Sequence, residues 1–174
     1  MTRSRSITFL GSAAALLAVL AVAGCGGGGN ASGSPAPPKT KDGRLATVGI
    51  ANEGLGKILV NSQARTLYLF QKDSGTMSEC TGACAVNWPP LRASSAPLVG
   101  SGANASMVGT TQRSDGKPQI TYNGHPLYLF VKDRKPGDTN GEALTAFGGS
   151  WFAVSPAGNP VSAKPANPGN GYGY

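Results

Sequence analysis

Two cysteines and a single histidine are the side chains in this sequence with the most versatile chemistry. Cys80 and Cys84 enclose three residues in the stretch Cys-Thr-Gly-Ala-Cys. Two thiols at this spacing can close a small disulfide loop, cycle between oxidised and reduced states, or offer two thiolates to a soft metal ion such as copper. His125 could complete such a metal site, or it could be a polar side chain at the rim of a β-hairpin. We expect the disulfide, with a redox or copper-handling pair as the alternative.

Two aspartates follow matching aromatic segments. Tyr-Leu-Phe-Gln-Lys-Asp ends at Asp73, and Tyr-Leu-Phe-Val-Lys-Asp ends at Asp133. A pair of carboxylates can perform acid–base chemistry or bind a cation, but an aspartate at the end of a strand commonly accepts backbone N–H groups in a turn. We expect the turn-capping role, because both copies keep the residue at the same place.

Other signatures of catalysis are absent from the sequence. It contains no Gly-x-Ser-x-Gly nucleophile turn, no Gly-Lys-Ser/Thr phosphate loop and no Cys-x-x-Cys-His haem attachment site. We therefore expect no catalytic residues and no cofactor.

Basic residues exceed acidic ones, but they are spread along the chain. The sequence has 15 Lys and Arg residues against 8 Asp and Glu residues, and loss of Arg3 and Arg5 with an export signal would leave 13 against 8. The closest cluster contains Lys132, Arg134 and Lys135. It is sparser than a nucleic-acid patch, and it is typical of a solvated loop that tolerates anionic lipid head groups. We therefore expect no nucleic-acid partner.

The N-terminal residues have the pattern of an export signal. Arg3 and Arg5 precede an apolar run over residues 7–23, and the run leads into Val-Ala-Gly-Cys, which ends at Cys25. Small residues directly before a cysteine resemble the bacterial lipobox, in which the thiol is acylated and the preceding residues are removed. We predict a signal peptide at 1–24 and a lipid on Cys25. An uncleaved transmembrane helix is the alternative, because the run is near the minimum length for crossing a bilayer.

This anchor predicts a location in the cell envelope. The lipid would hold the protein at the outer face of the cytoplasmic membrane, with the outer membrane as the second possibility. The membrane is then one partner, and the sequence does not identify a protein or small-molecule partner.

Composition divides the remaining chain into a tether, one domain and a tail. Residues 25–43 are rich in Gly, Ser and Pro, and 159–174 have the same character. Such segments bury too little apolar surface to offset the entropy of ordering, so we expect a flexible tether and a disordered tail. The intervening residues 44–158 suffice for one small domain. They read as two repeats, about 44–100 and about 101–158.

The repeated phrase predicts a strand that is covered on both faces. In the first copy, Leu67 and Leu69 alternate with Tyr68 and Phe70. Side chains alternate between the two faces of a strand, so each face presents large apolar groups. Downstream of each copy comes one tryptophan, Trp88 or Trp151.

Frequent turns and glycines around these strands favour an all-β, antiparallel fold. Asn123-Gly124 lies between two apolar runs and is a strong hairpin signal. The only helical candidate is short, over 81–87, and ends before Pro89. Neither repeat can cover its own apolar face, so we predict two pseudo-repeats packed into a small sandwich or partly open barrel, with at most one short helix.

Several of these stretches resemble a known family. "TLYLFQKD", "CTGACAVNWPPL", "RSDGKPQITYNGHPLYLFVKD" and "GGSWFAVSPAG" are similar to predicted bacterial lipoproteins with a Tyr-x-(Phe/Trp/Tyr)-x-x-Asp motif, also called the secreted repeat of unknown function. The motif positions are Tyr68, Phe70, Asp73, Tyr128, Phe130 and Asp133. The resemblance implies an exported, repeated lipoprotein domain and no particular activity. Our leading expectation is a binding or structural module of the envelope, with a redox or copper-handling protein as the alternative.

Overall fold

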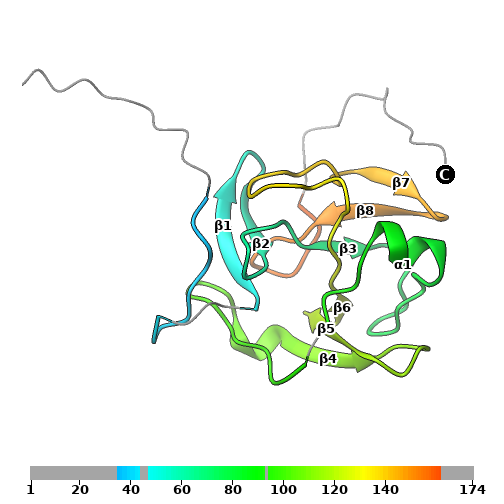
Figure 1. Ribbon diagram of the computed structural model, residues 1–174, viewed down its shortest axis with the longest axis horizontal. Helices are drawn as coiled ribbons and strands as arrows, with labels where there is room; N and C mark the ends of the chain where they lie inside the picture. Colours follow the sequence, from blue (N-terminus) through cyan, green and yellow to red (C-terminus); the bar gives the residue numbers. More distant parts are fainter. Residues whose placement is uncertain (1–34, 44–46, 93, 162–174) are drawn as a thin grey trace, which may run out of the picture. The chain divides into compact units, whose positions relative to one another are not determined.

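The computed structural model describes residues 35–43, 47–92 and 94–161 (Figure 1). These residues belong to one compact unit, Gly33–Tyr174. The two repeats therefore do not form separate bodies. The predicted signal peptide at 1–24, the lipidated Cys25 and most of the predicted tail lie outside the described residues.

Antiparallel strands dominate the described part of the chain (Figure 1). The strands are β1 (Gly49–Glu53), β2 (Gly56–Val60), β3 (Tyr68–Phe70), β4 (Val108–Gln112), β5 (Pro118–Tyr122), β6 (His125–Pro126), β7 (Leu144–Ala146) and β8 (Gly149–Ala153). They form three small antiparallel sheets, ordered β1-β2, β3-β8-β7 and β4-β5-β6. The helical elements are α1 (Ala83–Asn87) and the 3₁₀ turn η1 (Ala105–Met107). The prediction of an all-β antiparallel fold with one short helix is confirmed, and these strands do not close into a barrel.

Each repeat begins with a hairpin followed by a motif segment. The hairpin is β1-β2 in the first repeat and β4-β5 in the second. In the second repeat, Asn123 (φ 49°) and Gly124 (φ 80°) form the turn between β5 and β6. Two consecutive positive φ angles are the geometry that an Asn-Gly hairpin turn requires, so this predicted turn is confirmed.

The two repeats exchange strands rather than packing side by side. In the first repeat, β3 pairs with β8 of the second repeat, which places Phe70 opposite Trp151. In return, the second motif segment pairs with the chain around Pro89: Leu129 N donates to Pro89 O at 2.8 Å. Between the two motif copies, the backbone N–H of Tyr68 donates to the carbonyl of Tyr128, and the N–H of Tyr128 donates to the carbonyl of Tyr68, each at 2.9 Å. This reciprocal pair lies on a pseudo-twofold axis relating the repeats.

The tryptophans stack on each other near this axis. The ring centroids of Trp88 and Trp151 are 3.9 Å apart and the rings are nearly parallel, at 4°. Each tryptophan also stacks on the phenylalanine of the other repeat at 4.1 Å, Trp88 on Phe130 and Trp151 on Phe70. All four rings are at most 1% exposed. The three stacked contacts therefore each join one repeat to the other.

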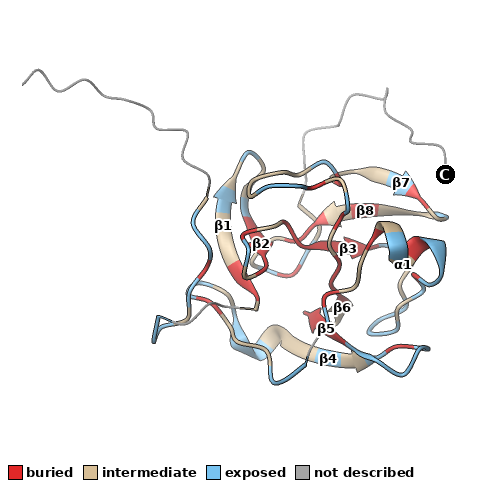
Figure 2. Ribbon diagram, in the orientation of Figure 1, coloured by how far each residue is buried: buried red, intermediate tan, exposed pale blue. Residues whose placement is uncertain are grey.

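Leucines fill the opposite face of the motif segments. Leu67, Leu69 and Leu127 pack with Ile120 in a second buried cluster, separate from the aromatic one. Figure 2 shows the buried residues gathered in β2, β3 and β5. The prediction of a strand covered on both faces is confirmed for the first copy, β3. The second copy, residues 127–130, is not a regular strand: it pairs through isolated bridges at Tyr128, and Leu129 is only partly buried.

Residues outside the predicted domain boundaries at 44 and 158 also pack against the domain. Pro38 is buried against Gly49, where a methyl group on the glycine would lie 2.2 Å from Pro38 Cβ. The carbonyl of Lys39 accepts a hydrogen bond from Ser101 N at 2.9 Å, and Val161 N donates to Ala153 O at 2.8 Å. Only glycine permits the approach of Pro38, so β1 is built to accept the segment that precedes it.

Candidate functional site

The motif tyrosines and aspartates join the two repeats to each other. Tyr68 Oη donates to Asp133 Oδ2 at 2.6 Å, and Tyr128 Oη donates to Asp73 Oδ2 at 2.8 Å. Each tyrosine thus uses the carboxylate of the other copy. The two copies of the motif therefore form a matched pair of hydrogen bonds that joins the two repeats.

Both aspartates also accept backbone N–H groups, at a longer range than a simple turn requires. Asp73 Oδ1 accepts from Glu79 N at 2.8 Å, six residues downstream, and Asp133 Oδ1 accepts from Asn140 N at 2.9 Å, seven residues downstream. Each carboxylate therefore bridges part of the loop that follows its motif copy. The expected capping role did not include the tyrosine of the other repeat.

The site around Asp133 is tightly closed. Asp133 is 1% exposed, and Tyr68 Oη also accepts from Gly141 N at 3.2 Å. A methyl group on Gly141 would lie 2.8 Å from the Trp88 ring, so only glycine fits. Burial raises the pKa of the Asp133 carboxyl, and burial together with the neighbouring carboxylate raises the pKa of the Tyr68 hydroxyl.

The site around Asp73 holds a buried cation that the sequence did not indicate. Tyr128 Oη lies 2.7 Å from Ser78 Oγ as well as bonding to Asp73. Arg113, which is 5% exposed, donates to Ser78 Oγ, to Gln119 Oε1 at 2.6 Å and to the carbonyl of Cys80. An arginine beside an Asp-Gly turn suggests an exposed side chain, so no local pattern marks Arg113 as buried. Burial raises the pKa of the Asp73 carboxyl to about 6, and the Arg113 charge opposes part of that rise.

Cys80 and Cys84 are joined in a disulfide. The bond secures the loop whose Cys80 carbonyl accepts from Arg113, and Cys84 lies within α1. The predicted disulfide is confirmed. As a disulfide, the pair presents no thiolate to a metal ion, and His125 is on a different element, in β6 opposite Tyr122. Within residues 35–43, 47–92 and 94–161, no three His, Cys, Asp or Glu side chains are grouped to hold a metal. A redox or copper-handling role stays a prediction.

Comparison with protein families agrees with this repeat structure. A model of the family described as "secreted repeat of unknown function" matches residues 49–92 and 109–155, more than half of the 174 residues. The chain belongs to this family. Searches of curated proteins and of solved structures found no match.

Each matched segment of this secreted-repeat protein contains the hairpin that begins its repeat, one motif copy and one tryptophan. The family description indicates an extracellular or envelope protein, and a disulfide is typical of such compartments. In the described part of the chain, no helix has the length and apolar character needed to cross a bilayer.

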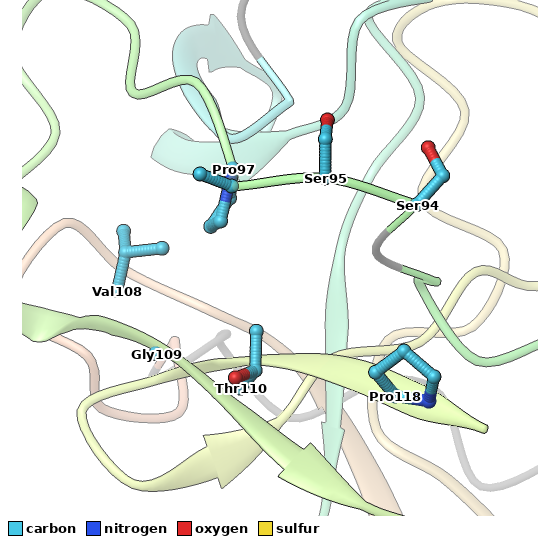
Figure 3. A pocket seen from close by; sticks show the side chains of 8 residues that line it. Ser94, Ser95, Pro97, Val108, Gly109, Thr110 and Pro118 are labelled. Carbon is cyan, nitrogen blue, oxygen red and sulfur yellow. The ribbon is translucent and has the colours of Figure 1, made fainter.

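A groove of about 490 Å³ lies beside β4 of the secreted-repeat domain. Its lining residues are small or uncharged: Ser94, Ser95, Ala96, Pro97, Val108, Gly109, Thr110 and Pro118. Figure 3 shows the Ser94–Pro97 segment passing along one side, with Thr110 and Pro118 pointing toward it from the strands. This groove suits an uncharged ligand or a segment of polypeptide. No pattern in the sequence indicates this groove, because it forms where the connector between the repeats passes along β4, the strand that follows it.

Asp73 should make the domain less stable as the pH rises from about 4 to about 7. Its pKa is raised from an ordinary 3.8 to about 6, so between these values the folded protein keeps a proton that the unfolded chain has released. The contribution of Asp73 to the free energy of unfolding is therefore fully present below about pH 4, and it is lost as the pH rises through 6. Asp73→Asn should remove this pH dependence, because the side-chain amide does not titrate in this range while its oxygen can still accept from Tyr128 Oη. The free energy of unfolding of variant and parent would be compared in urea from pH 4 to 7.

Asp115→Asn is the matched control for this titration. Asp115 is an exposed carboxylate paired with Arg92, and its pKa is lowered to about 2. It stays ionised from pH 4 to 7 in folded protein, so its removal should leave the shape of the pH profile unchanged. Asp133 and Glu142 also have raised pKa values, but they are present in every protein compared. A profile for Asp73→Asn that runs parallel to the parent would contradict the assignment.

Proposed function

We propose that the protein is an exported lipoprotein, held at the outer face of the cytoplasmic membrane by lipid on Cys25, whose double-repeat domain acts as a binding module. The support for export is the lipobox-like Val-Ala-Gly-Cys, the family's description as secreted and the disulfide. The groove beside β4 supplies a surface on which a ligand can be bound.

One observation favours a module over an enzyme. The motif side chains with acid–base capacity, Tyr68, Asp133, Tyr128 and Asp73, bond to each other across the repeats. Their role is to hold the two halves together, and three of the four are almost completely buried. A scaffold locked in this way presents its surface without changing shape, which is what a binding module requires.

The anchor is tested by the mass of the mature N-terminus. In a bacterial host, the full chain should begin at Cys25 and carry the mass of acyl chains, and it should fractionate with the cytoplasmic membrane. The Cys25→Ser variant should carry no acyl mass. An unmodified Cys25 in the parent, or retention of Met1, contradicts lipid anchoring, and fractionation with an outer membrane contradicts the proposed side.

The same purified protein tests the module against the redox alternative. As a module it should show no titratable thiol at Cys80 or Cys84 under mild reductant and should bind no Cu(I). A pair that is reduced readily and takes up one equivalent of copper would replace the binding module with metal handling. Cys80→Ser/Cys84→Ser serves as the control that removes both thiols.

A further inference from the structure

One side of β4 is an edge of its sheet. In the order β4-β5-β6, β4 pairs only with β5. The phase of this pairing follows from the two ends of the hairpin, where Asn123 N donates to Met107 O at 2.8 Å and Arg113 N donates to Lys117 O at 3.2 Å. Since bonded and non-bonded pairs alternate along antiparallel strands, the odd-numbered residues of β4 bond to β5. The even-numbered residues turn their backbone groups toward the edge.

The groove beside β4 lies at this edge. Val108, Gly109 and Thr110 line the groove, and Thr110 is exposed. The Val108 N–H donates to the carbonyl of Ala105 in η1, which leaves the Val108 carbonyl for another donor. Among the residues that the structure describes, no backbone group pairs with the Val108 carbonyl or with the N–H and C=O of Thr110. One donor and two acceptors are therefore open at the edge.

The first repeat has an edge that is equivalent to this one. In each repeat, the leucine before the motif tyrosine donates its N–H to the preceding strand, at Leu59 in the first repeat and at Ile120 in the second. The partner of Leu59 across its hairpin is Ile50, and the partner of Ile120 is Thr110. Ile50 of the first repeat therefore corresponds to Thr110 of the second.

A segment of the chain itself pairs with the equivalent edge in the first repeat. By the same correspondence, Val48 matches Val108. Val48 N donates to Leu98 O at 3.2 Å, and Gly100 N donates to Val48 O at 2.7 Å, so that residues 98–100 lie parallel to the edge. In the described part of the second repeat, no segment takes this position, and the groove is found there instead. The fold therefore accepts extended polypeptide at one of two equivalent edges and leaves the other open.

The residues of β4 do not protect its edge. Edge strands commonly carry lysine, proline or a bulge, which discourage pairing with another chain. The sequence of β4 is Val-Gly-Thr-Thr-Gln, which has no charge and no proline, and valine and threonine favour strands. The lining of the groove is also uncharged, so a charged ligand would lose hydration there without gaining a partner. The edge and the groove together match an extended peptide with uncharged side chains.

We propose that the open edge of β4 binds an extended, uncharged polypeptide segment of a partner protein, which joins the sheet as an added strand. The proposal rests on the proposed binding role of the groove, and it names the class of ligand. The backbone of the partner donates to the Val108 carbonyl and exchanges both hydrogen bonds with Thr110. The Ser94–Pro97 segment, which passes along the other side of the groove, covers the added strand (Figure 3).

Amide hydrogen exchange tests whether the edge is open in the free protein. In the chain from residue 26 onward, the Thr110 amide should exchange at least about tenfold faster than the amides of Gly109 and Thr111, after correction for intrinsic rates, because those two amides are bonded to β5. Equal protection of the three amides would overturn the proposal, since the edge would already be paired. Protection of Thr110 that increases with protein concentration would also overturn it, because the partner would then be a second copy of the chain.

A synthetic peptide tests the addition of a strand. The probe is Ala-Pro-Leu-Val-Gly-Ser-Gly, the sequence of residues 96–102, which contains the segment that pairs with Val48. At millimolar concentration it should slow exchange at Thr110 and shift the NMR signals of Val108 and Thr110. The same peptide with N-methyl groups on its leucine, valine and glycine keeps its side chains but loses three donors, and it should bind at least about tenfold more weakly.

The two peptides separate failure of this proposal from failure of the binding role. If both peptides shift the signals of the groove equally, the groove binds ligands but strand addition is wrong. If neither peptide protects Thr110, strand addition is wrong as well. Analysis of lipid on Cys25 is independent of either result, so the anchor can stand or fall separately.

Thr110→Pro is the matched change on the protein. Proline lacks the N–H group and is tolerated on an edge strand where that group faces away from the ladder. The variant should bind the probe at least about tenfold more weakly, whereas Thr110→Val, which keeps the backbone donor, should bind it within about twofold of the parent. Equal binding by the two variants would contradict the proposal. Circular dichroism verifies that each variant is folded, and if Thr110→Pro is not, the N-methylated peptide still gives the deciding comparison.

Discussion

Separately produced halves of the domain, residues 35–100 and 101–161, are expected to remain unfolded alone and to assemble into the native domain when mixed. Each half would lack the partner for its central strand. Tyr68 of the first half takes both its backbone hydrogen bonds at Tyr128 and its side-chain acceptor, Asp133, from the second half. Each tryptophan likewise stacks on rings supplied by the other half. Isolation exposes these rings and leaves their strands unpaired.

Tryptophan fluorescence can follow the assembly, because each half contains one of the two tryptophans. Mixing should shift the tryptophan emission to shorter wavelength. It should also give an NMR spectrum with well-dispersed signals, whereas each half alone should give the narrow signal dispersion of an unfolded chain. A second half carrying Asp133→Ala should assemble only at higher concentration, since Tyr68 Oη then loses its buried acceptor. Either half giving cooperative unfolding as a monomer would show that the halves do not depend on each other.

Trp88→Ala should lower the free energy of unfolding by about 3–5 kcal/mol, as for other buried tryptophans. The ring is fully buried, stacks on Phe130 and Trp151, and meets Tyr68 edge-on at 5.4 Å. Its removal leaves a cavity between the repeats, which the exchanged strands cannot close because they are fixed by backbone pairing on both sides. Since the free energy of unfolding of a small domain is only about 5–15 kcal/mol, the variant should be only marginally stable at room temperature.

Val86→Ala is the matched control for this substitution. Val86 lies on α1, two residues before Trp88, and is 71% exposed. Its truncation should change the free energy of unfolding by no more than about 0.5 kcal/mol. Urea unfolding of both variants, followed by circular dichroism, gives the comparison. A loss below about 1 kcal/mol for Trp88→Ala would mean that the tryptophan stack does not hold the repeats together.

Alternation and turn chemistry were sufficient to predict the fold class. The alternation of Leu67 and Leu69 with Tyr68 and Phe70 correctly indicated two covered faces, and Asn123-Gly124 correctly indicated a hairpin. These signals are local, because they depend on residues close together in the chain. The exchange of strands between repeats is not local. Hydrophobic patterning shows that a face must be covered, but it does not specify which copy covers it.

The candidate sites were less accessible to sequence reasoning for the same reason. Arg113 follows β4 and contacts the loop of Cys80, 33 residues away, and only the fold brings them together. The basic loop was visible as a cluster around Arg134, but its position beside Pro35 depends on a contact between Gly137 and the first described residue. The groove beside β4 depends on the path of the connector, whose small residues carry no chemical signature.

The crossed tyrosine–aspartate bonds also constrain how this sequence can evolve. Tyr68 depends on Asp133, and Tyr128 on Asp73, so a change in one copy alters the selective value of a residue in the other. The gene segments that encode the two copies are therefore not free to diverge independently after duplication. Compensating substitutions should couple position 68 with 133 and position 128 with 73, and not the tyrosine and aspartate of one copy.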